Sequence, residues 1–64
     1  MTGAWYVWRG VGAHLVWYMD HEGRSVGAPD RHLFPSWQEA DEAARRGGWR
    51  HYEITWCPAP AQNV

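Results

Sequence analysis

The segment from Phe34 to Gly48, FPSWQEADEAARRGG, carries the signals of both ends of a helix. Ser36 followed three residues later by Glu39 is a capping box, in which the hydroxyl accepts an orphan backbone N–H of the first turn and the carboxylate accepts the N–H of Ser36. Two arginines in the last turn and the pair Gly47-Gly48 are typical of a helix end. We therefore expect a helix that begins at Trp37.

The two sides of this helix differ, and the difference limits what it can pack against. The apolar arc of the helical wheel holds Trp37, Ala40, Ala43, Ala44 and Gly47, and the opposite arc holds Gln38, Asp41, Glu42, Arg45 and Arg46. Because Ala and Gly supply little volume, large side chains of a facing sheet must fill the layer between them. The six Trp, three Tyr and one Phe of this 64-residue chain can do so, and they reinforce a core that is marginal at this length.

The segments expected to form the sheet are rich in Trp, Tyr, Val and Ile. They are residues 5–9, 14–19 and 49–57, with 24–27 as a short additional strand, a hairpin loop over 9–13 and a turn over 20–23. The predicted fold is α+β: a small antiparallel or mixed sheet of three to four strands with one helix packed on one face, in the order strand, strand, weak strand, helix, strand. We expect residues 1–57 to form a single domain and the Pro-rich residues 58–64 to form a flexible tail.

The stretch Trp5-Tyr6-Val7-Trp8 indicates that both faces of the sheet carry aromatic side chains, because alternate residues of a strand point to opposite faces. One helix covers one face and leaves the other open. The favoured core is Trp5, Val7, Leu15, Trp17, Met19, Tyr52, Ile54 and Trp56. The candidate binding site on the open face is then Tyr6, Trp8, Tyr18, His51 and Glu53, a mixture typical of interaction hot spots.

Two alternatives to this site stay open. The opposite register would expose Trp5 and Trp17 instead, and scattered aromatic side chains also occur on surfaces without a function.

A secondary acidic surface consists of Glu39, Asp41 and Glu42. Its i, i+4 pairing with Arg45 and Arg46 is, however, typical of an ordinary solvated helix.

The sequence favours neither catalysis nor a metal or other cofactor. The four histidines (14, 21, 32 and 51) and Cys57 lack the paired spacing of a zinc site, and no nucleophile accompanies His51 and Glu53. A net charge of −1 argues against nucleic acid as the main partner. One cysteine, no signal peptide and no long apolar segment predict a cytoplasmic protein that does not enter a membrane.

A hairpin followed by Phe34-x-Ser36-x-x-Glu39-Ala40-x-x-Ala43-Ala44-Arg45 resembles the strand, strand, capped-helix arrangement of small phage and mobile-element proteins, among them the anti-CRISPR inhibitors. The likeness covers Trp5 to Cys57 in outline. It implies a compact, non-catalytic inhibitor in the cytoplasm of a bacterial host, bound to a protein partner such as a CRISPR effector or another defence complex. One alternative is a small nucleic-acid-binding regulator with Arg9, Arg45 and Arg50 beside the aromatic face. Another is an accessory subunit, monomeric or homodimeric, that dimerises through that face.

Overall fold

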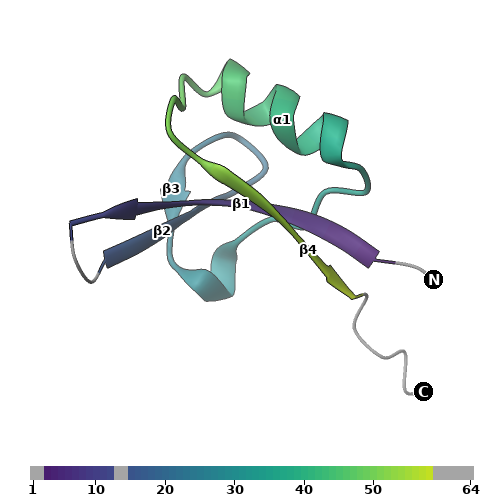
Figure 1. The fold of residues 1–64 in the computed structure, drawn as a ribbon, viewed down its shortest axis with the longest axis horizontal. Coiled ribbons are helices and arrows are strands. Elements are labelled where there is room, and N and C mark those ends of the chain that lie inside the picture. Colours follow the sequence, from purple (N-terminus) through teal and green to yellow (C-terminus); the bar gives the residue numbers. More distant parts are fainter. Residues whose placement is uncertain (1–2, 13–14, 59–64) are drawn as a thin grey trace.

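The structure is a computed structural model that describes residues 3–12 and 15–58. Its elements are β1 (Gly3–Val11), β2 (Leu15–Met19), β3 (Ser25–Val26), the 3-10 helix η1 (Ala28–Asp30), α1 (Trp37–Arg46) and β4 (Glu53–Pro58). The strands form one antiparallel sheet in the order β3-β2-β1-β4, with α1 on one face (Figure 1). The predicted α+β class is confirmed. His14, the expected first residue of the second strand, and residues 59–64 of the expected tail lie outside the described residues.

The long central strand β1 has different neighbours along its two halves. Its N-terminal half pairs with β4, from Gly3↔Pro58 to Trp8↔Glu53, and its C-terminal half pairs with β2, from Trp8↔Tyr18 to Val11↔Leu15. The β1–β2 hairpin therefore projects beyond β4 and α1 (Figure 1). The predicted loop over 9–13 was too long, because β1 continues to Val11 and the left-handed turn residue is Gly12.

The helix begins and ends where its caps predict. The backbone N–H of Glu39 donates to the Ser36 hydroxyl over 3.2 Å, and that hydroxyl donates to the Glu39 carboxylate, which replaces the expected bond to the Ser36 N–H. At the other end Gly48 has φ 82° and donates to the Arg45 carbonyl, while Trp49 donates to the Ala44 carbonyl. These two bonds are the Schellman arrangement of a helix end.

Trp49 closes the gap between the helix end and the sheet. It was expected to begin the last strand, but that strand starts at Glu53, and the side chain of Trp49 is buried. Its indole Nε1 donates to the Gly23 carbonyl over 2.8 Å, and the Arg9 guanidinium lies 4.4 Å from its ring centroid. At this point Gly23 and Gly47 also meet backbone to backbone, since a Cβ on either would lie 3.1 Å from the Cα of the other.

The core lies between α1 and the N-terminal half of β1. Its buried members are Val7, Met19, Phe34, Ala40, Ala44 and Trp49, and Trp5, Ala43, Tyr52 and Ile54 pack against them. The favoured register is therefore right, but Leu15, Trp17 and Trp56 are 57%, 37% and 40% exposed and were wrongly placed in the core. A helix of ten residues is only about 15 Å long, so it does not reach the projecting hairpin, which holds Leu15 and Trp17. Trp56 belongs to the edge strand β4 and lies over Gly3, which has no side chain to cover it. Trp37, expected on the packed side of the helix, is also exposed.

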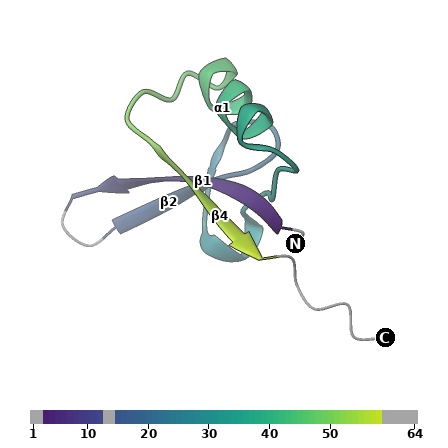
Figure 2. The same ribbon diagram turned by 45° about the vertical axis from the view of Figure 1, so that its right-hand side comes forward.

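The second face of the sheet, opposite α1, is partly covered by η1. Figure 2 shows this short teal segment beneath the sheet, with α1 above it. The connection around η1 is held to the strands by backbone bonds from His32 to Met19 and between Trp5 and Phe34. The expectation that nothing covers this face was therefore wrong at its centre.

Candidate functional site

The second face carries a hollow lined by aromatic and β-branched side chains, as the alternation along the strands predicts. Trp8 and Tyr18 are direct cross-strand partners, and Tyr6 and Thr55 are another such pair. Together with Val16 they enclose a shallow space of about 350 Å³, which we call the aromatic hollow (Tyr6, Trp8, Val16, Tyr18 and Thr55). Three of the five predicted site residues, Tyr6, Trp8 and Tyr18, thus lie together. The alternation also places Val16 and Thr55 here, although neither stood out as a site residue.

Trp8 is held in one orientation within this hollow. Its indole Nε1 donates to the Thr55 hydroxyl over 2.9 Å, across the boundary between β1 and β4. The side chain is only half-buried, so part of the ring faces solvent. A large side chain whose orientation is already fixed loses little conformational entropy when it is covered by a partner.

Arg31 covers the tyrosine side of the aromatic hollow. Its guanidinium lies 5.0 Å from the ring centroid of Tyr6 and 5.8 Å from that of Tyr18, at cation–π distance from both. Its Nη1 donates to the Ala28 carbonyl of η1 over 2.9 Å. This contact could not be predicted from the sequence, because Arg31 lies in an irregular segment without periodicity. The accessible part of the hollow is consequently centred on Trp8 and Val16.

The remaining predicted site residues, His51 and Glu53, line a neighbouring polar hollow of about 440 Å³. Its lining is Trp8, Arg9, Gly10, Arg50, His51, Tyr52 and Glu53. His51 and Glu53 are exposed, and Glu53 is the cross-strand partner of Trp8. Trp8 therefore separates the two hollows and contributes to both.

The acidic surface of α1 is occupied by contacts within the chain. The Asp41 carboxylate accepts the Tyr52 hydroxyl over 2.6 Å and pairs with the Arg45 Nε at 3.0 Å. Glu42 pairs with Arg46 at 3.7 Å, and Glu39 belongs to the helix cap. The hydrogen bond to Asp41, followed by burial, raises the pKa of the Tyr52 hydroxyl above its usual value of 10.0. These contacts leave little net charge on this surface for a partner.

The basic residues of the nucleic-acid alternative do not converge. Arg45 pairs with Asp41 on α1, whereas Arg9 and Arg50 line the polar hollow. Trp49, which could have stacked on a base, is buried beneath Arg9. Of the residues proposed for nucleic-acid binding, Arg9 and Arg50 still lie beside an accessible aromatic side chain, that of Trp8.

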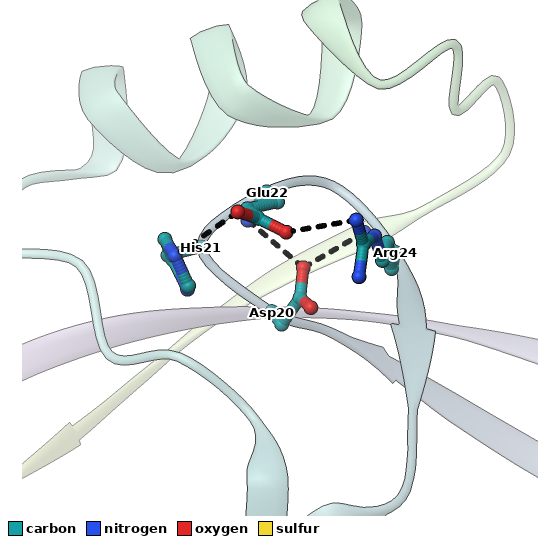
Figure 3. Close-up of polar contacts among 4 residues, drawn as sticks. All are labelled: Asp20, His21, Glu22 and Arg24. Atoms are coloured by element: carbon teal, nitrogen blue, oxygen red, sulfur yellow. Dashed lines mark hydrogen bonds and ion pairs between the residues drawn. The ribbon is translucent and has the colours of Figure 1, made fainter.

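The charged side chains of the turn between β2 and β3 bond to one another and to the backbone of the turn, and so stabilise it. Figure 3 shows the Asp20 carboxylate facing the backbone of the turn, where one oxygen accepts the N–H groups of Glu22 and Arg24 over 2.8 and 2.9 Å. The bond from Arg24 is the main reason why the pKa of Asp20 lies below its usual value of 3.8. Glu22 pairs with Arg24 at 3.2 Å and lies 3.7 Å from His21.

A search of residues 3–12 and 15–58 for three or more His, Cys, Asp or Glu side chains that could hold a metal ion found no such group. In the same part of the chain no helix has the length and apolar character needed to cross a membrane. Comparisons with models of known protein families, with curated proteins and with solved structures gave no match.

Proposed function

We propose that this protein is a small, non-catalytic binding module that docks on a larger protein through the aromatic hollow. The observation that supports this most directly is Trp8, a half-exposed indole fixed by Thr55 between two hollows. Hot spots of protein interfaces are enriched in Trp, Tyr and Arg, in well-packed surroundings. The neighbouring Tyr18 and Arg31 add the other two residue types.

A matched pair of tryptophan variants tests this proposal. Trp8→Ala removes the centre of the site, whereas Trp37→Ala removes an exposed tryptophan, 45% accessible, from α1. The purified protein is used to capture partners from a bacterial lysate, and the affinity of each captured protein is then measured with both variants. We expect Trp8→Ala to lose about 2 kcal/mol or more, roughly thirtyfold in Kd, and Trp37→Ala to bind normally. Equal binding by both variants would refute the site.

The more specific form of the proposal is an inhibitor of a bacterial defence complex, such as a CRISPR effector. Its support is the sequence resemblance over the hairpin and the capped helix. The test is a phage-plaquing assay in CRISPR-active bacteria that express the protein or its Trp8→Ala variant. Restored plaquing with the natural protein and reduced plaquing with the variant is the expected result.

Nucleic acid is the competing partner at the same site, because Arg9 and Arg50 lie beside Trp8. With a net charge of −1 the chain gains little from counterion release, so we expect only weak oligonucleotide binding at physiological salt. Fluorescence anisotropy with single-stranded and duplex oligonucleotides measures this. Sub-micromolar affinity, lost in Arg50→Ala, would favour the nucleic-acid regulator instead.

A further inference from the structure

The outer edge of β4 presents hydrogen-bonding groups that no described residue uses. β4 is the last strand in the sheet order, so only one of its sides faces β1. The direction of its backbone groups follows from β1. There, Trp5 and Phe34 exchange both N–H···O bonds, at 2.9 and 2.7 Å, on the side of β1 away from β4. Since these groups alternate sides along an antiparallel strand, Tyr6 and Trp8 point theirs toward β4.

The partners of these residues fix which groups of β4 face outward. Thr55 and Glu53, opposite Tyr6 and Trp8, bond to β1. Ile54 and Trp56 alternate with them, so their backbone N–H and C=O groups point away from the sheet.

This edge has few of the features that usually prevent strands from pairing. Natural edge strands carry charged side chains, above all lysine, or proline or bulges, which block the addition of another strand. In β4 the charged residue is Glu53, at its first position. Between Glu53 and Cys57 there is neither lysine nor proline, and the register with β1 runs without interruption. Pro58 stands only at the end of the strand. Trp56, whose backbone groups point outward here, has its indole turned over Gly3 of β1 and is still 40% exposed.

We propose that a second copy of this chain pairs with the β4 edge, antiparallel and about a twofold axis at Thr55. In this register the outward groups of Ile54 meet those of Trp56 of the second copy, and the reciprocal pair is equivalent. An aromatic residue is then paired with a β-branched one, a favourable cross-strand combination, although the Trp56 indole itself lies over Gly3. Glu53 lies opposite Cys57 of the second copy, so no two like charges face each other.

The neighbouring registers fit less well. An axis at Glu53 would place this carboxylate directly opposite its own copy, which is destabilising. An axis at Ile54 would pair Trp56 with Tyr52, which lies before β4 and bonds to Asp41 on the helix side. An axis at Trp56 would pair Ile54 with Pro58, which has no N–H to donate.

This dimer does not depend on the proposed function, but it has a consequence for the aromatic hollow. Trp8 bonds to Thr55, and Thr55 lies at the axis. The aromatic hollows of the two copies would therefore lie side by side on one continuous sheet. Because edge pairing from Glu53 to Cys57 involves only five residues of each copy, it buries less than the roughly 800 Å² per partner of a standard interface, and we expect the dimer to be concentration-dependent.

Two substitutions of Cys57 test the register by sedimentation over a range of concentrations. Cys57→Lys places a positive charge opposite Glu53 of the second copy, whereas Cys57→Glu places a like charge there. We expect the dimer dissociation constant to fall several-fold in the first and to rise several-fold in the second. Thermal melts of both variants check that the fold is kept. A monomer at all concentrations, or equal effects of both substitutions, would overturn the proposal.

A disulfide trap tests the axis independently. Thr55→Cys in a Cys57→Ser background brings two cysteines together at the axis, with Cα atoms about 4.5 Å apart, within the range that a disulfide spans. In the natural chain the two Cys57 residues would be roughly 13 Å apart along the strands and could not be bridged. We expect mild oxidation to link the variant far more than the natural chain. Equal linkage in both, or pairing of the edge with a foreign strand while the protein stays monomeric, would overturn the proposal.

Discussion

The hydrogen bond between Tyr52 and Asp41 attaches the helix to the last strand, and Tyr52→Phe measures its contribution. The bond is short, 2.6 Å, and its acceptor is a carboxylate of which only 15% of the side-chain surface is exposed. Hydrogen bonds to charged groups contribute about 1.5 to 3 kcal/mol. Asp41 keeps Arg45 and some access to water after the substitution, so we expect a loss of about 1 to 2 kcal/mol. For a domain of this size that is roughly 6 to 15 °C in Tm.

The pH dependence identifies the bond as the cause of this loss. Because the folded-state pKa of Tyr52 is raised above 10.0, the folded protein holds this proton more tightly than the unfolded chain. The resulting stability is fully present below about pH 10 and is lost as the pH rises through the folded-state value. We therefore expect the difference between the natural protein and Tyr52→Phe to be constant from pH 6 to about pH 9 and to close above pH 10.

The control is Tyr6→Phe, since no described residue bonds to the Tyr6 hydroxyl. It should change stability by less than about 0.5 kcal/mol. Thermal and denaturant unfolding across the pH range measure all three proteins. An equal loss in both variants, or a difference that does not decrease as the pH rises above 10, would refute the reasoning.

Two further pairs of variants test the packing by the same unfolding measurements. Gly12→Ala should lower the free energy of unfolding by about 1 kcal/mol, because Gly12 has φ 71° but open space around it. Gly23→Ala should cost at least about 1 kcal/mol more, because φ is 85° and the new Cβ would also meet the helix end at Gly47. Equal costs would contradict the close contact between Gly23 and Gly47. Met19→Ala should cost about 2 to 5 kcal/mol because the side chain is fully buried, whereas Leu15→Ala on the exposed hairpin should be nearly silent.

The features that were predicted correctly from the sequence are those that short-range signals determine. The capping residues located the helix to the residue, because caps act on backbone groups within one turn. The strand alternation placed Tyr6, Trp8 and Tyr18 on the same face, because every second residue of a strand points to the same side of the sheet.

The alternation of side chains along a strand does not show how far the helix on that face extends, and this accounts for the residues that were wrongly placed in the core. Leu15 and Trp17 have the parity of the core but extend past the end of α1, and Trp56 lies at the edge. Arg31 was missed for a related reason. It reaches the tyrosines from an irregular connection, and the path of such a segment depends on long-range packing that no local pattern encodes.

The pairing of β1 with β4 has a consequence for how the chain is made. Trp8 and Thr55, which share a hydrogen bond, are 47 residues apart. At a synthesis rate of about 5 to 20 residues per second, the central strand waits roughly 2 to 9 seconds for the strand that completes it. During this time its aromatic residues have only the hairpin partner, which by itself is marginally stable in water. A ribosome that pauses before β4 would therefore hold an apolar, unfinished sheet, and chaperone dependence should grow with the length of that pause.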